Sequence, residues 1–217
     1  MPGLVGADMV GSAMAKIFSV VTKQGLSRAF DPVARGLLRA RITPDMVTVA
    51  GSLGAVAAAV VFATRGRLVI ATFVITACAL LDVLDGAMAR ARGHSTRFGA
   101  LLDSTMDRVV DGAVFGCLAY WLGTTGERAT AAAALLCLVL GQLVSYVKAR
   151  AEGLGLSADV GIAERFERLV IIGLGGLAYG VHIPYALPVA LWLLVVLSLL
   201  TVGQRVAHVY RLDRGSP

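Results

Sequence analysis

Charged residues are scarce in this sequence. Asp, Glu, Lys and Arg together make up 16% of the 217 residues, whereas 57% of the residues are hydrophobic. Soluble globular domains carry about a quarter of their residues as charged side chains, and the mean hydropathy of +0.78 also lies outside their usual range. The shortage of charge therefore excludes an ordinary soluble domain and predicts a membrane protein.

Cysteine is also rare, and the three cysteines stand alone. Cys78, Cys117 and Cys137 each lie within an apolar stretch, and no two of them have the spacing of metal ligands. We interpret them as small buried apolar side chains, which leaves no basis for a zinc or thiol redox site. The chain also lacks a basic run with interleaved aromatic residues, so nucleic acid is not an expected partner.

Six apolar segments are long enough to cross a membrane as helices, because about 20 residues span a hydrocarbon core of roughly 30 Å. The second, third and fourth segments carry charges near their ends, so we expect them to project beyond the bilayer or to line a polar cavity. The sequence thus predicts an all-α integral membrane bundle of six transmembrane helices. The expected segments are residues 46–64, 68–89, 98–122, 129–150, 166–182 and 185–207.

The distribution of Lys and Arg predicts the orientation. Most of these residues precede the first segment, follow the last one, or lie between segments two and three or four and five, whereas the opposite side receives Arg65, Arg67 and Arg128. Basic residues stay preferentially on the cytoplasmic side, so both termini should be cytoplasmic in a cell membrane. The net charge of +6 then gathers at one interface, where it favours anionic lipid headgroups or phosphorylated substrates.

The residues before the first segment divide into two parts. Residues 1–26 have too few apolar residues to cross a membrane, and two interpretations stay open: an interfacial amphipathic helix, or residues contributed by an expression vector. The following stretch alternates apolar and basic residues with helical period, which predicts an amphipathic juxtamembrane helix on the cytoplasmic surface. The expected membrane domain covers residues 27–210, and residues 211–217 form a tail.

Four carboxylates lie at regular spacing in an otherwise apolar region. Asp82 and Asp85 are three residues apart at the end of the second segment, and Asp103 and Asp107 are four apart at the start of the third. Both spacings place the side chains on one helical face, and a short loop lets the two faces meet. Oxygen ligands suit Mg²⁺, Mn²⁺ or Ca²⁺, and four carboxylates are enough for two metal ions. The alternative is that these acids cap helices or pair with Arg90, Arg97 and Arg108.

The stretch "DVLDGAMARARGHSTRFGALLDSTMD" resembles the signature of the CDP-alcohol phosphotransferase family, D-x-x-D-G-x-x-A-R followed after eight residues by G-x-x-x-D-x-x-x-D. The matching positions are Asp82, Asp85, Gly86, Ala89, Arg90, Gly99, Asp103 and Asp107. The resemblance implies a membrane enzyme, usually a homodimer, that moves a substituted phosphoryl group from a CDP-linked donor to an alcohol and releases CMP. It also implies two Mg²⁺ ions, with Mn²⁺ as a substitute, on the four Asp, and Asp107 as the general base.

The donor site follows from the same resemblance. Gly86, Arg90 and Thr96 match positions that hold the nucleotide part of the donor, and small residues such as Ala89 and Gly99 let a base or phosphate approach the backbone. Simple helix packing is the alternative for the small residues. Asp111 extends the stripe of acids by one turn but lies outside the signature. We interpret it as a residue that supports neighbouring site residues or as an ion-pair partner, rather than as a catalytic residue.

The basic residues near the ends of segments four, five and six could together form a cationic pocket for an acceptor that carries a phosphate. Each one alone could equally be part of a solvated basic fringe. The pieces "TPDMVT", "SYVKARAE" and "ERFERL" most resemble bacterial phosphatidylinositol phosphate synthases over roughly residues 28–210. That subfamily joins CDP-diacylglycerol to inositol 1-phosphate. The resemblance adds Asp45, Met46, Val47 and Thr48 to the donor site and assigns the acceptor phosphate to Lys148, Arg150, Arg165, Arg168 and Arg205.

Two other functions stay open at this stage. A phosphatidylglycerophosphate synthase would also use a basic pocket, for glycerol 3-phosphate as the acceptor. A divalent-cation transporter could carry acids within its membrane helices, but its acids would follow a path across the membrane. Here they gather at one end, and Gly86, Ala89 and Arg90 would have no role in transport.

Overall fold

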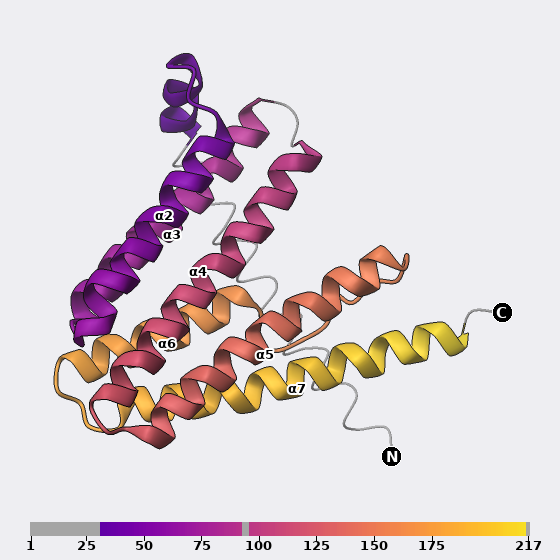
Figure 1. Ribbon diagram of the computed structural model, residues 1–217. Helices are drawn as coiled ribbons and strands as arrows, with labels where there is room; N and C mark the ends of the chain where they lie inside the picture. Colours follow the sequence, from indigo (N-terminus) through magenta and orange to yellow (C-terminus); the bar gives the residue numbers. More distant parts are fainter. Residues whose placement is uncertain (1–30, 93–95, 216–217) are drawn as a thin grey trace. The chain divides into compact units, whose positions relative to one another are not determined.

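The computed structural model describes residues 31–92 and 96–215, and every regular element in these two ranges is helical (Figure 1). The proposed segment of residues 1–26 lies outside the described residues. A short 3₁₀ helix, η1 (Ala63–Arg65), follows the first long helix. The α-helices are α2 (Pro44–Phe62), α3 (Leu68–Ala91), α4 (Arg97–Thr124), α5 (Arg128–Gly153), α6 (Arg165–Gly180) and α7 (Ala186–Gly215).

Each of the six apolar segments coincides with a helix, which confirms the all-α prediction. Four helical stretches are long and apolar enough to cross a membrane: Pro44–Arg65, Leu68–Ala91, Arg128–Gly153 and Ala186–Arg214. The other two helices differ from these for physical reasons. α4 carries several charges in its first half, and α6 has only 16 residues, about 24 Å at 1.5 Å per residue. Six crossings therefore stay a prediction.

The end of the amphipathic juxtamembrane segment is helical. Residues 31–39 form helix, and Ala34 is fully buried in a cluster with Val47 of α2 and with Leu84, Ala87 and Met88 of α3. Leu37 and Leu38 pack against the same cluster, whereas Arg35 and Arg39 are exposed. One face of this helix is thus apolar and packed, as helical periodicity requires. Its position at a membrane surface stays a prediction.

The chain divides into two compact units. Unit 1 comprises residues 1–53 and 77–106, and unit 2 comprises residues 54–76 and 107–217. Within unit 1, α2 approaches α3 closely at Gly51, where an added Cβ would lie 3.3 Å from the Cys78 carbonyl oxygen and from Leu81 Cβ. Glycine at this position removes the side chain that would separate the two helices. This packing fixes the parts of α2 and α3 that carry Asp45, Thr48, Asp82 and Asp85.

Unit 2 is organised around α7, which packs along both α5 and α6 (Figure 1). A completely buried stripe runs along α7 with alternating spacings of four and three residues, the period of a helix face that packs against neighbours. The stripe contains Leu187, Leu191, Leu194, Ser198 and Thr201. α6 approaches α7 so closely that a Cβ on Gly175 would lie 2.4 Å from Ala190 Cβ. Larger side chains at this crossing would push α6, and the arginines at its start, away from α7.

Candidate metal and phosphate site

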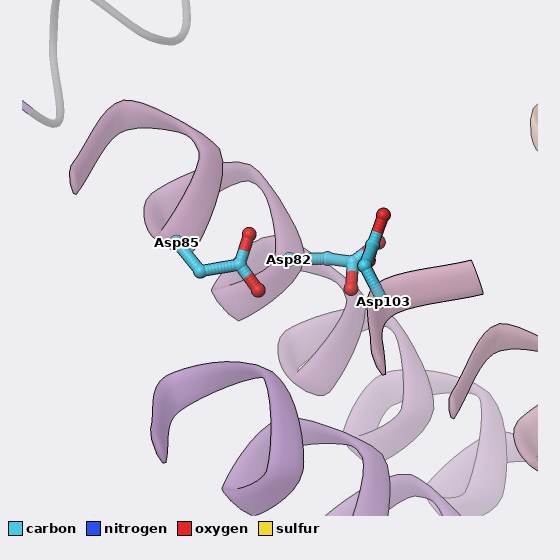
Figure 2. A group of neighbouring side chains, drawn as sticks. All are labelled: Asp82, Asp85 and Asp103. Carbon is cyan, nitrogen blue, oxygen red and sulfur yellow. The ribbon is translucent and has the colours of Figure 1, made fainter. Parts of the chain in front are cut away.

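Three carboxylates meet in unit 1. Asp82 and Asp85 project from α3, Asp103 projects from α4, and one oxygen of each lies within 4.8 Å of the oxygens of the other two (Figure 2). Like charges at this separation repel one another, and the repulsion is strong where water is scarce. A divalent cation relieves it, and an all-oxygen donor set fits Mg²⁺ or Mn²⁺ better than zinc. The residues present therefore suit a hard divalent metal.

Asp85 is the most enclosed of the three acids, with 8% of its surface exposed. The hydroxyl of Thr48, which is also buried, donates a short hydrogen bond to Asp85 Oδ2 and lies 3.2 Å from the Pro44 carbonyl oxygen. Thr48 sits in the second turn of α2, and Pro44 begins that helix at a position where its missing N–H is not needed. The start of α2 thereby orients one carboxylate of the cluster.

The start of α4 lies close to the same region of unit 1. Thr96 Oγ1 accepts a hydrogen bond of 2.9 Å from the Gly99 amide, which caps the helix. An added Cβ on Gly99 would lie 3.0 Å from Thr96 Oγ1 and 3.1 Å from Asp45 Oδ1. Asp45, Thr96 and Gly99 are thus gathered at one place, and glycine at position 99 leaves room for the Asp45 carboxylate.

The other residues that the sequence predicts at the donor site differ in their exposure. Gly86, Ala89 and Arg90 lie on the last turns of α3, where Arg90 is exposed and a Cβ on Gly86 would be 3.5 Å from Arg90 Nη1. Met46 is exposed, whereas Val47 belongs to the apolar core. The side chain of Val47 therefore has a packing role, which the sequence alone did not indicate. The assignment of these residues to a donor stays a prediction.

Asp107, the fourth predicted metal ligand, is described with unit 2 and is held there by arginines. Its Oδ1 lies 2.8 Å from Arg165 Nη1, and its Oδ2 lies 3.6 Å from Arg108 Nη2. Arg108 was one of the partners considered in the ion-pair alternative, so that alternative holds in part for Asp107. Asp82, Asp85 and Asp103 form a group of acids within the described part of unit 1, and participation of Asp107 in metal binding stays a prediction.

Asp111 forms a buried ion pair, as the sequence interpretation expected. Its Oδ2 accepts a 2.7 Å hydrogen bond from Arg168 Nη2, and its Oδ1 lies 3.8 Å from Arg165 Nε. Arg165 and Arg168 are three residues apart at the start of α6 and reach the same carboxylate, so they share a helical face. Arg168 is 2% exposed. The alternative of a solvated basic fringe is therefore wrong for Arg168.

Arg205 is equally buried, at 3% exposure, and all three of its guanidinium nitrogens contact protein acceptors. Nε donates to the Val160 carbonyl, Nη1 to the Val144 carbonyl in the second half of α5, and Nη2 lies 3.2 Å from Glu164 Oε1. These contacts tie α5 and the connection before α6 to α7. A solvated fringe is excluded here too, and the contacts show that Arg205 also has a structural role.

The other two predicted acceptor residues lie at the surface of unit 2. Lys148 is partly exposed and forms an ion pair with Asp159, which lies in the connection between α5 and α6. Its ammonium is also 3.9 Å from Glu152 Oε1 on the next turn of α5. Arg150 is exposed. A phosphate role for either residue stays a prediction.

Sequence reasoning missed the contribution of Thr201 to this site. Its hydroxyl accepts hydrogen bonds from the amides of Ile162 and Ala163, at 3.3 and 3.0 Å, and donates one to the Leu197 carbonyl. Gly161, with φ +141°, packs against it so closely that an added Cβ would be 2.5 Å from Thr201 Cγ2. A usable signal existed: polar side chains within an apolar membrane segment usually have a specific partner.

Comparisons with known proteins agree on a single family. Residues 41–207 match the family model of the CDP-alcohol phosphatidyltransferases. The phosphatidylinositol phosphate synthase of Mycobacterium marinum is 48% identical over 194 residues, which cover 88% of this chain and 83% of the relative. The enzyme of the same name from Streptomyces avermitilis is 43% identical over 217 residues, 96% of this chain and 88% of the relative.

Solved structures give the same result. The crystal structure of Mycobacterium tuberculosis phosphatidylinositol phosphate synthase with CDP-DAG bound is 46% identical, with a TM-score of 0.81 over 84% of this chain and 94% of that one. The structure of that enzyme in complex with manganese and citrate has the same identity and TM-score and covers 83% of this chain and 88% of that one.

The apolar helices and the match along most of the sequence lead to one conclusion. This chain is a multi-pass membrane enzyme that belongs to the CDP-alcohol phosphatidyltransferase family.

Proposed function

We propose that this enzyme transfers the phosphatidyl group of CDP-diacylglycerol to inositol 1-phosphate, giving phosphatidylinositol phosphate and CMP. The observation that carries the proposal is the convergence of Asp82, Asp85 and Asp103 within the family signature. It is supported by relatives named phosphatidylinositol phosphate synthase and by the one whose crystal structure contains CDP-DAG. We further propose a homodimer in the cell membrane, with both termini and the active site cytoplasmic.

Asp82, Asp85 and Asp103, joined by Asp107, would hold two Mg²⁺ ions. Mn²⁺ could take their place, since the relative of known structure binds manganese. When bound, the ions supply positive charge that stabilises the attacking and leaving oxygens of a phosphoryl transfer. Thr48 would keep the Asp85 carboxylate in position through its hydrogen bond. A fixed ligand geometry reduces the reorganisation needed during the reaction.

The donor would be bound by residues of unit 1. Asp45, Met46, Val47 and Thr48, with Gly86, Ala89, Arg90, Thr96 and Gly99, form the proposed donor site. Gly86 and Gly99 would let the nucleotide approach the backbone, and the exposed Arg90 would neutralise the pyrophosphate charge that grows as CMP leaves. These residues lie at the ends of α2, α3 and α4 in the same unit as the acid cluster.

The acceptor hydroxyl must lose its proton while its oxygen attacks the phosphorus that carries the diacylglycerol group. We propose that Asp107, a carboxylate four residues beyond Asp103 in α4, is the general base that accepts this proton. The new phosphorus–oxygen bond forms as the bond to CMP breaks, and the electron pair of that bond leaves with CMP. Lys148, Arg150, Arg165, Arg168 and Arg205 would surround the phosphate of the acceptor. Bidentate contacts from arginine would fix its orientation.

A transfer assay tests the acceptor directly. The purified enzyme in lipid nanodiscs is given radiolabelled CDP-diacylglycerol, Mg²⁺ and one acceptor at a time. We expect phosphatidylinositol phosphate from inositol 1-phosphate, and at least tenfold lower turnover with free inositol, glycerol 3-phosphate or serine. Preference for glycerol 3-phosphate would overturn the proposed acceptor and identify a phosphatidylglycerophosphate synthase.

A further inference from the structure

Asp111 is a buried acid outside the family signature. It is 3% exposed, and its strongest contact is the 2.7 Å hydrogen bond from Arg168, which is itself 2% exposed. Burying both members of an ion pair removes their hydration, and a pair of apolar residues is often as stable or more stable. Stability alone is therefore a weak reason for this pair, and a role in orienting one of the partners explains it better.

The pair fixes one end of the Arg168 guanidinium. Nη2 binds Asp111, whereas Nε is buried and has no hydrogen-bond partner among the residues that the structure describes. Gly141 of α5 faces the same group, and a Cβ there would be 3.5 Å from Arg168 Cζ and Nε. The guanidinium thus lies beside a glycine backbone, and its Nε–H is still able to donate a hydrogen bond. A buried donor without a partner is unfavourable unless a ligand or water supplies an acceptor.

Asp111 also lies next to the second arginine of α6. Its Oδ1 is 3.8 Å from Arg165 Nε, and Arg165 Nη1 binds Asp107. Two carboxylates one turn apart on α4 therefore face two arginines three residues apart on α6. Arg108 adds a third guanidinium beside Asp107. Three guanidinium groups thus gather around two carboxylates, and guanidinium N–H donors are well suited to binding the oxygens of a phosphate.

We propose that Asp111 is a positioning residue that holds the guanidinium groups of Arg165 and Arg168 in the orientation that the phosphate of the acceptor requires. It contacts the two arginines and not the substrate. Arginine loses much rotamer freedom when it binds a ligand, and a partner that orders the side chain in advance reduces this loss. The inference rests on the proposed function, because it presumes an acceptor that carries a phosphate.

The test compares Asp111→Asn with the wild type in steady-state kinetics, with each substrate varied in turn. Asn keeps the size of the side chain but removes its charge. We expect KM for inositol 1-phosphate to rise about tenfold or more, as for the loss of a charge-assisted hydrogen bond. KM for CDP-diacylglycerol and kcat should stay within about twofold. Glu127→Gln, an exposed acid before α5, is the matched control and should leave all three constants unchanged.

A double-mutant cycle separates positioning from a general structural effect. If Asp111 acts through Arg168, adding Asp111→Asn to Arg168→Ala should change KM for the acceptor by less than half of its effect in the wild type. A lower Tm, together with a lower kcat and equally raised KM values for both substrates, would show that Asp111 is merely structural. That result would overturn the proposal. Unchanged acceptor KM in Asp111→Asn would overturn it as well.

The results for the wild type distinguish a failure of the proposed function from a failure of the inference about Asp111. If the wild type uses glycerol 3-phosphate instead of inositol 1-phosphate, the proposed acceptor is wrong and the same comparison is made with glycerol 3-phosphate. If the wild type is inactive with every acceptor, the inference is tested by binding, as the increase in Tm that inositol 1-phosphate causes. An increase in Tm for the wild type but not for Asp111→Asn supports the inference. Transfer to unphosphorylated acceptors alone, or no Tm shift, contradicts it.

Discussion

The two units use aspartate in opposite ways. In unit 1, three carboxylates converge with their oxygens within 4.8 Å of one another. In unit 2, Asp107 and Asp111 are each held by arginines, at 2.8 and 2.7 Å. Residues 97–106 of α4 belong to unit 1 and the rest of the helix to unit 2, so one helix supplies acids of both kinds.

This difference shows how the balance of charge selects the ligand. Where carboxylates face one another, a cation is favoured between them, and oxygen ligands favour Mg²⁺ or Mn²⁺. Where arginines surround carboxylates, their guanidinium N–H donors favour an anion such as phosphate. The aspartates of the two units therefore differ in their neighbours, which are other carboxylates in unit 1 and arginines in unit 2.

The largest expected effect follows from breaking the unit 1 cluster. Asp82→Asn, Asp85→Asn or Asp103→Asn should each leave less than a tenth of wild-type turnover, a barrier increase of more than about 1.4 kcal/mol. Each substitution removes a negative oxygen ligand without changing the size of the side chain. The measurement is transfer from radiolabelled CDP-diacylglycerol, with size-exclusion profiles as the control for folding. Turnover above a tenth in any of the three would refute the metal assignment.

Asp107→Asn tests whether this residue belongs functionally with the acids of unit 1. If Asp107 is the general base, the variant should still bind CDP-diacylglycerol but lose at least about 100-fold in the transfer step. Binding is measured by equilibrium filtration and transfer by single-turnover kinetics. Because Asn has no carboxylate to deprotonate, raising the pH should not restore the rate. Recovery at alkaline pH would place the base elsewhere.

Arg168→Ala tests the anion side of the comparison. Loss of a charge-assisted contact, about 1.5 to 3 kcal/mol, should raise KM for inositol 1-phosphate by one to two orders of magnitude. KM for CDP-diacylglycerol should hardly change. Arg39→Ala, an exposed arginine of unit 1, serves as the control. An unchanged acceptor KM would remove Arg168 from the acceptor pocket.

The smallest expected effect concerns the connection between α5 and α6. Gly161→Ala places a Cβ 2.5 Å from Thr201 Cγ2 at φ +141°, which should destabilise the protein by about 1 to 3 kcal/mol. Tm in detergent gives the measurement. Gly153→Ala is the matched control, since nothing lies within 4 Å of a Cβ there and its Tm should stay the same or rise slightly. Equal Tm values for the two variants would contradict the close packing on α7.

Much of the local structure could be predicted from the sequence. Hydrophobic length located the helices, and the spacing of Asp82, Asp85 and Asp103 anticipated their convergence because both helices are joined by a short loop. α7 continues beyond the predicted apolar segment, which ends at residue 207, because the polar residues that follow extend the helix to Gly215. Composition does not show where a helix leaves an apolar environment.

Contacts between residues that are far apart in the sequence were harder to predict. Asp111 and Arg168 are 57 residues apart, and Arg205 and Val144 are 61 apart. No periodicity specifies such partners, so the sequence could indicate that Arg168 and Arg205 are basic but not that they are buried. The roles of Thr201 and Gly161 depend on the same tertiary contact between α7 and the connection before α6.

Metal binding distinguishes the two units most directly: under the proposed function the acids of unit 1 hold a divalent metal, and the arginines of unit 2 take no part in metal binding. Titration of the purified protein with Mn²⁺, followed by electron paramagnetic resonance, measures this without relying on activity. We predict that Asp85→Asn weakens Mn²⁺ binding at least about tenfold, because a charged oxygen ligand is lost. Arg168→Ala should bind Mn²⁺ as the wild type does. Unchanged Mn²⁺ affinity in Asp85→Asn would contradict the account.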